Sequence, residues 1–308
     1  MTRLQEITNR YPIRKTKEQK DAFLKYAVTE ARGMGYTARV ERNGGHRNFV
    51  AGDPERANVI FTAHYDTSAN RLLPNPMIPR NIPLFLLCQL GIVALLFVVS
   101  FCAGWLSFVL TRESGLTLVV FLLAYYALLM LMILGPANKN NANSNTSGVA
   151  AVMQLMAQLP VEIRDQAAFL LFDNGEKGKA GSRAYAGRHP EIKKQTVVFN
   201  MDCVGVGEHL LIICKNYARA TYAYPLLTES FKARDGITPH FYPSSGSAVN
   251  SDHQSFRRGF CAVCCKRRRG VGFYTPDIHT GRDTRASQGN IDYLTGSLVT
   301  FVKSVAAG

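Results

Sequence analysis

Two long apolar segments constrain the fold of this chain more than any other feature of its sequence. Residues 82–110 contain no Asp, Glu, Lys or Arg, and a second apolar run covers residues 116–134. A helix needs roughly 20 residues to cross the hydrocarbon core of a bilayer, so each segment is long enough to span a membrane. A pair of buried core helices is the alternative, but adjacent segments of this length without a polar stripe favour the membrane. The pattern predicts a transmembrane helical hairpin.

The short connection at residues 111–115 makes the two helices antiparallel, so the chain before and after them lies on one side of the membrane. Arg71, Arg80 and Lys139 flank that side, whereas the connection contains only Arg112. Positively charged residues favour the cytoplasmic side, and the polar first 20 residues do not resemble a secretory signal. Seven dispersed cysteines also suit a reducing compartment. We therefore expect an integral membrane protein whose polar part faces the cytoplasm.

The net charge of +14, from 36 Lys and Arg against 22 Asp and Glu, suits either nucleic acid or an anionic membrane surface as a partner. The hairpin favours the membrane. The basic run at residues 266–269 has no nucleic-acid recognition motif beside it, so we expect no nucleic-acid partner and a lipid bilayer in contact with residues 82–134. The oligomeric state is not indicated by the sequence.

The polar parts of the chain alternate between strand-like and helical patterns. A helix is expected after Thr16, which can cap it together with Gln19, and it should end near Gly33. Other helices are expected at 149–159, 182–187, 222–233 and 291–305, and strands at 37–42, 47–51, 58–63, 167–172, 196–201, 210–214 and 260–265. This alternation predicts an α/β fold with a mixed, mainly parallel sheet flanked by helices. Residues 1–81 and 135–308 should form one discontinuous domain, with the hairpin at 82–134 inserted in it.

Polar residues that directly follow apolar strands mark the edge of a parallel sheet where ligands gather. His64 and Asp66 follow the third predicted strand, Glu176 and Asp202 follow later strands, and His279 lies in the loop at 274–284. Two imidazoles and two carboxylates are typical zinc ligands, and Asp66 can orient the His64 ring from behind. Helix caps and surface polar residues at strand ends are the alternative interpretation.

The segments around these residues resemble, in the same order, the motifs of the di-zinc aminopeptidases, metallopeptidase family twenty-eight. The matching segments are His64-Tyr65-Asp66-Thr67, residues 143–148, residues 172–178 with Gly181-Ser182, Asn200-Met201-Asp202, Ser251-Asp252-His253 and Ile278-His279-Thr280. The resemblance implies a zinc aminopeptidase-like fold, hydrolysis of amino-terminal peptide bonds, and two zinc ions as cofactors.

Residue by residue, the resemblance implies that His64 and Asp202 bind one zinc and that Glu176 and His279 bind the other. Two positions depart from the family pattern. The aspartate that bridges both metals is replaced by Ser144, and the glutamate that acts as general base is replaced by Gly175.

These two departures weaken both the metal site and the chemistry. Without the bridge each metal keeps two protein ligands, whereas catalytic zinc sites usually supply three, so we expect weak, single or absent zinc. Loss of a general base typically costs about 10²–10⁴ in rate, and the nearby Asp173 sits in a tight turn that should misplace its carboxylate. We expect an impaired peptidase with a peptide as substrate or ligand. A non-catalytic peptide-binding or regulatory protein is the alternative, and a hairpin serving a transport or scaffold assembly is a third.

Overall fold

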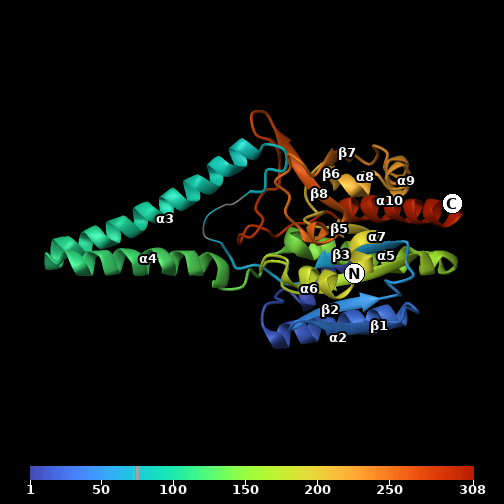
Figure 1. The fold of residues 1–308 in the computed structure, drawn as a ribbon, viewed down its shortest axis with the longest axis horizontal. Coiled ribbons are helices and arrows are strands. Elements are labelled where there is room, and N and C mark those ends of the chain that lie inside the picture. Colours follow the sequence, from blue (N-terminus) through green and yellow to red (C-terminus); the bar gives the residue numbers. More distant parts are fainter. Residues whose placement is uncertain (72, 74–75) are drawn as a thin grey trace.

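The computed structural model describes residues 1–71, 73 and 76–308, without the side chain of residue 133. Its nine strands form one sheet in the order β1-β2-β4-β3-β5-β8-β6-β7, with β9 paired to β8 (Figure 1). The strands are β1 Ala38–Asn43, β2 His46–Ala51, β3 Val59–His64, β4 Ala167–Phe172, β5 Val197–Met201, β6 His209–Cys214, β7 Thr238–Pro243, β8 Arg258–Arg268 and β9 Gly272–Tyr274. The strand β3 precedes the apolar hairpin in sequence, yet it lies between two strands that follow the hairpin.

The centre of the sheet is parallel and its flanks are largely antiparallel. The pairs β3–β4, β3–β5, β5–β8 and β6–β7 are parallel. The pairs β1–β2, β2–β4, β6–β8 and β8–β9 are antiparallel. The predicted mixed α/β sheet is therefore confirmed, and its parallel pairs bring the carboxyl ends of β3, β4 and β5 to one edge.

Helices cover both faces of this sheet. They are α1 Arg3–Arg10, α2 Lys17–Gly33, α5 Gly148–Gln158, α6 Ala180–Arg188, α7 Pro190–Gln195, α8 Asn216–Arg219, α9 Ala223–Ser230 and α10 Gln288–Ala307, with short helical segments η1 Ala142–Ser147, η2 Val161–Gln166 and η3 Asp252–Ser255. Thr16 caps α2 with the predicted box to Gln19. The helix α1, which the sequence analysis missed, begins with a second capping box between Thr2 and Gln5.

Alternate residues of the central strands point to opposite faces and build two apolar cores. Phe61, Phe169 and Phe199 are fully buried on the face covered by α5 and α10. Leu170 and Val198 are buried on the other face, against α6 and α7. Both faces of the sheet are thus covered by apolar side chains, so polar residues are placed at the ends of its strands.

The apolar hairpin consists of α3 Ile82–Thr111 and α4 Ser114–Leu134, and it projects away from the sheet (Figure 1). Both helices are long and apolar enough to cross a membrane. Most of their large side chains are exposed, and Leu90, Leu110 and Leu123 are among the most exposed apolar residues. Gly104 of α3 packs against α4, where an added Cβ would lie 3.1 Å from the Cβ of Phe121. The two helices therefore contact each other and leave their other sides uncovered by protein.

Candidate functional site

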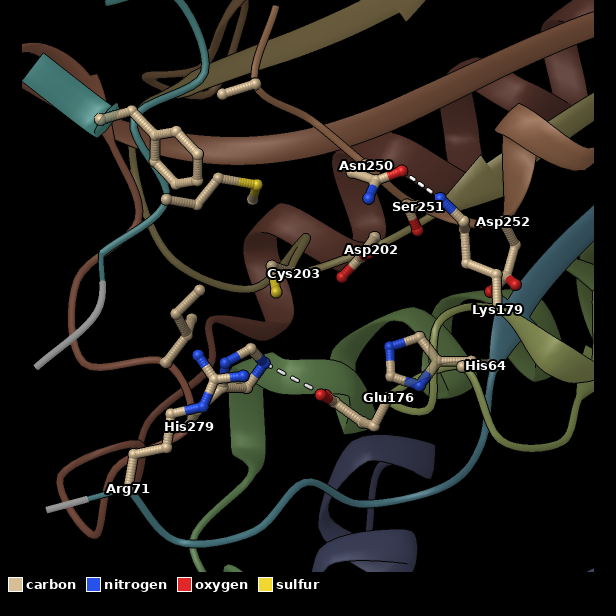
Figure 2. Close-up of a pocket in the computed structure, with 15 residues that line it drawn as sticks. His64, Arg71, Glu176, Lys179, Asp202, Cys203, Asn250, Ser251, Asp252 and His279 are labelled. Carbon is tan, nitrogen blue, oxygen red and sulfur yellow. Dashed lines mark hydrogen bonds and ion pairs between the residues drawn. The ribbon is translucent and has the colours of Figure 1, made fainter. Parts of the chain in front are cut away.

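The four predicted metal ligands line one pocket at the carboxyl edge of the sheet (Figure 2). His64 is the last residue of β3, Glu176 follows β4, Asp202 follows β5, and His279 comes from the loop after β9. The pocket has a volume of about 200 Å³. Because β3, β4 and β5 are parallel neighbours, residues that are far apart in sequence meet at their ends.

Within this pocket the side chains form two polar pairs. Glu176 Oε1 lies 3.1 Å from His279 Nε2, as the dashed line in Figure 2 marks. His64 Nδ1 lies 3.2 Å from Asp66 Oδ1. The Asp66 carboxylate also accepts hydrogen bonds from the backbone N–H of Gly175 at 2.7 Å and of Glu176 at 3.2 Å. Asp66 therefore holds the His64 ring and the turn after β4 in a fixed relation.

The charges in the pocket shift each other's protonation. Burial lowers the pKa of His64, but the carboxylates of Asp66, Asp202 and Glu176 outweigh it and raise that pKa to about 10. Burial raises the pKa of Glu176, but His279, followed by His64, lowers it to about 2. The carboxylates thus create a negative potential that favours a proton on the His64 imidazole when no other cation is bound.

The pocket offers donors that suit zinc, and two of them lie close together. Imidazole nitrogen and carboxylate oxygen are the ligands that zinc takes in catalytic sites. The 3.1 Å between Glu176 and His279 is close to the separation of about 3.3 Å that two ligands of one tetrahedral zinc ion have. Over residues 1–71, 73 and 76–308, no group of three His, Cys, Asp or Glu side chains is close enough to hold a metal ion. The donor types therefore fit zinc, and Glu176 with His279 is a pair of them at a suitable separation.

Gly175 lies against the His64 side chain, which leaves no room for a side chain of its own. A Cβ at this position would lie 2.4 Å from both Cβ and Cγ of His64. Contacts between carbon atoms are normally about 3.5–4.0 Å. The position predicted for the missing general base is thus closed by a proposed ligand.

Ser144 does not belong to the described residues that line the pocket. It is buried in η1, where its backbone N–H donates to Asp283 Oδ2 at 2.9 Å and the N–H of Asn143 donates to Asp283 Oδ1 at 2.8 Å. Its hydroxyl has no hydrogen-bond partner in the described part of the chain. Burial raises the pKa of Asp283 to about 6. The predicted bridging position is therefore occupied by a short side chain behind the pocket.

Asp173, the carboxylate two residues before Gly175, is directed elsewhere. Its Oδ1 forms a buried ion pair with Lys20 Nζ at 2.5 Å, and its Oδ2 accepts the backbone N–H of Arg47 at 3.1 Å. The expectation that Asp173 is misplaced for catalysis agrees with these contacts.

Several residues of the pocket were not predicted as site residues from the sequence. Asp252 is fully buried in the lining, its two oxygens have no hydrogen-bond partner among the described residues, and burial raises its pKa to about 6. Its neighbour His253, which lies in the same sequence motif, is buried outside the lining. Phe85 of α3 and Met77 also line the pocket. Asp252 had a signal in the sequence, since it stands in one of the six matching motifs, whereas Phe85 and Met77 stand in none of them.

The backbone is strained around the pocket. Lys179, Cys203 and His279 all line it and have left-handed φ angles of 63°, 57° and 61°. Such conformations are uncommon for residues other than glycine, and they cluster at functional sites. The strain supports a functional role for this pocket.

Solved structures of other proteins share this fold. The Legionella pneumophila LapA aminopeptidase superposes with a TM-score of 0.59 at 13% identity, covering 99% of this chain and 70% of that protein. The Porphyromonas gingivalis glutaminyl cyclase superposes with a TM-score of 0.57 at 12% identity, covering 98% and 96%. A Zn-dependent exopeptidase from Parabacteroides distasonis gives a TM-score of 0.56 at 12% identity, covering 97% and 94%.

A search of curated proteins found no matching relative. A sequence model of peptidase family M28, in contrast, matches residues 131–293. The matched region includes β4, β5 and β8 and the positions of Glu176, Asp202 and His279. Because this match covers more than half of the sequence, and the fold is shared with an aminopeptidase, the chain belongs to peptidase family M28.

Proposed function

We propose that the chain is a membrane-anchored zinc peptidase of the aminopeptidase type whose activity is impaired. The observation that carries this proposal is the convergence of His64, Glu176, Asp202 and His279 in one pocket at the carboxyl edge of the sheet. Each comes from a different strand end or loop, and each is a residue type that binds zinc. Membership of a peptidase family supplies the reaction class.

In this proposal His64 and Asp202 hold zinc on one side of the pocket, and Glu176 and His279 hold it on the other. Bound zinc polarises a carbonyl oxygen and lowers the pKa of water. Asp66 positions both sides, because the same carboxylate contacts the His64 ring and the backbone of Glu176. Groups behind a metal ligand that fix its orientation typically matter for affinity.

The impairment follows from the two departures from the family pattern. Gly175 has no side chain to accept a proton and no space for one. Ser144 brings no negative charge and lies behind the pocket. Asp252 lines the same pocket as Glu176 and His279, and burial raises its pKa to about 6, near the range in which general bases operate. We assign it the residual proton transfer.

Membrane anchoring is supported by the exposure of the hairpin. A core helix of a soluble protein would be mostly buried, whereas the apolar side chains of α3 and α4 are exposed and lie far from the amino terminus. We propose that residues 82–134 cross the bilayer and that residues 1–81 and 135–308 form the cytoplasmic domain. Arg71, Arg80 and Lys139 then lie on the cytoplasmic side, where basic residues are favoured. Extraction of membranes with alkaline carbonate tests the anchoring, and release of the chain would contradict it.

The activity is tested on the purified full chain in micelles or nanodiscs. We expect bound zinc and slow hydrolysis of aminoacyl reporter substrates, and both should fall sharply in Glu176→Gln and His279→Ala. Glu162→Gln is a matched control, because Glu162 is exposed in η2, outside the pocket lining. Asp252→Asn should lower kcat while zinc remains bound. Hydrolysis that survives Glu176→Gln would show that the reaction does not use this pocket.

A non-catalytic peptide-binding protein is the second candidate, favoured by the close contact between Gly175 and His64. It predicts peptide binding in the pocket, with or without zinc, and no hydrolysis above background. The double variant Ser144→Asp and Gly175→Glu restores the two family residues. The new side chain at position 175 fits only if His64 moves, and this movement can displace zinc. Zinc content is therefore measured on the double variant together with hydrolysis. Full activity of the wild-type chain would contradict both candidates.

A further inference from the structure

The wall of the pocket is shared between the α/β domain and the apolar hairpin. Phe85, in the first turn of α3, lines the same pocket as Glu176 and His279. Phe85 lies three residues after Ile82, which places it about 5 Å along the helix from the start of the apolar segment. With α3 proposed to cross the bilayer from its first turn, this part of the pocket wall lies where the helix would enter the membrane.

The start of α3 is fixed to the domain by a series of hydrogen bonds. The backbone N–H of Thr275 donates to Met77 O at 3.0 Å, and that of Ala248 donates to Pro79 O at 2.9 Å. The Arg80 guanidinium donates to Gly246 O at 2.8 Å. These contacts hold the segment before α3 against the rim of the pocket, so the hairpin is a fixed part of the pocket's wall.

The lining of the pocket divides into a charged part and an apolar part. The charged part contains the imidazoles and carboxylates described above, together with Arg71 and Lys179. Phe85, Met77 and Ile278 contribute apolar surface to the same lining. An occupant that satisfies both parts has a polar, reactive end and an apolar side chain next to it.

Basic residues surround the point where α3 begins. The side-chain amide of Asn81, the N-cap of α3, donates to Val271 O at 3.2 Å, in the turn between β8 and β9. Arg268, the last residue of β8, and Arg269, in this turn, are exposed. A basic surface beside a membrane-spanning helix faces the anionic headgroups of the cytoplasmic leaflet. This charge supports an orientation in which the mouth of the pocket lies against the lipid surface.

We propose that the pocket binds the amino-terminal end of a peptide that lies on the membrane surface, with an apolar side chain of its first residues against Phe85. This substrate class rests on the proposed function, since it takes the charged part of the pocket to be the reaction site. The membrane then concentrates the substrate beside the pocket, and the first turn of α3 selects for an apolar residue.

The test uses the full chain in nanodiscs of phosphatidylcholine with anionic phosphatidylglycerol. Two peptides with the same apolar first residues are compared by fluorescence anisotropy, one with an amphipathic helical tail that binds lipid and one with a soluble tail. Binding to empty nanodiscs is subtracted. We expect the membrane-bound peptide to bind at least about tenfold more tightly, and Phe85→Ala to weaken that binding about tenfold.

Two further variants control for folding and membrane depth. Leu86→Ala removes the adjacent side chain, which is 53% exposed and lies outside the described lining, and it should change the dissociation constant less than about twofold. Phe85→Leu keeps an apolar wall and should retain most of the binding. Equal binding of the membrane peptide by wild type, Phe85→Ala and Leu86→Ala would overturn the proposal.

Failure of this proposal can be distinguished from failure of the proposed function. If a soluble aminoacyl substrate is cleaved and Phe85→Ala leaves both kcat/KM and peptide binding unchanged, the peptidase assignment stands and the membrane substrate is wrong. If no substrate is cleaved but binding depends on Phe85, the pocket takes a membrane peptide without hydrolysing it. Absence of both cleavage and peptide binding overturns the two proposals together.

Discussion

Gly175→Ala adds one methyl group at the most crowded point of the pocket. The new Cβ would lie 2.4 Å from Cβ and Cγ of His64, more than 1 Å inside a normal carbon contact. His64 cannot retreat freely, because it is buried and its ring contacts Asp66. The backbone of Gly175 cannot shift either without losing its 2.7 Å hydrogen bond to the same carboxylate. Overpacking of this kind costs about 1–3 kcal/mol.

Thermal unfolding of the full chain in micelles measures this cost. For domains of 150–250 residues each kcal/mol corresponds to about 2–4 °C, so Gly175→Ala should lower Tm by a few degrees to about 10 °C. Gly187→Ala is the matched control, because a Cβ in that turn of α6 meets nothing within 4 Å. It should leave Tm unchanged or raise it slightly, as expected for alanine in a helix. We also expect Gly175→Ala to lose zinc. If Gly175→Ala has the same Tm as the wild type and keeps its zinc, the idea that His64 leaves no room for a side chain at position 175 is refuted.

Three other substitutions test buried charge and helix packing. The pKa of Asp252 is raised to about 6, against 3.8 for a free group. The free energy of unfolding of the metal-free protein therefore falls by roughly 3 kcal/mol as pH rises from about 4 to above 6. Asp252→Asn should therefore match the wild type near pH 4 and exceed its unfolding free energy near pH 7, and a pH-independent difference in denaturant titrations would contradict this. Lys20→Met leaves the Asp173 carboxylate buried and unpaired and should cost about 3–5 kcal/mol by the same titrations, with partial recovery when Asp173→Asn is added. Gly104→Leu should separate α3 from α4 and cost about 1–3 kcal/mol in thermal unfolding. Gly91→Leu is the control and should be tolerated, because nothing lies within 4 Å of a Cβ at this position. Equal melting temperatures of the two variants would refute the contact of Gly104 with α4.

The strands with continuous apolar runs could be predicted from the sequence. The strand β4 has the predicted bounds, β3 is shifted from them by one residue at both ends, and β5 begins one residue later than predicted. These segments are buried on both faces, so pattern and burial agree. The strand β7 was missed, because Thr238–Pro243 contains two prolines and stands at the edge of the sheet, where proline is tolerated.

The residues that gather at the site could be predicted, but not the space between them. His64, Glu176, Asp202 and His279 follow strands or lie in a loop that the topology brings to one edge. The contact between Gly175 and His64 joins two residues that are far apart in sequence, and no local pattern encodes a distance of that kind.

The same limit applies to the wall of the pocket. Phe85 has the sequence features of an ordinary membrane-spanning residue, and only the three-dimensional arrangement makes it part of the pocket. The hydrogen bonds that fix the start of α3 come from turns much later in the chain, after β7 and after β8.

The strand order also determines when this protein can fold during its synthesis. The strand β3 leaves the ribosome before the hairpin, but its two partners, β4 and β5, are made roughly a hundred residues later. Until then an apolar strand has two unpaired edges while α3 and α4 are synthesised, and such edges attract other chains. A fragment that begins after the hairpin lacks the strand that joins β4 to β5. We therefore expect expression of that fragment alone to give aggregates, and co-expression of residues 1–81 to rescue it.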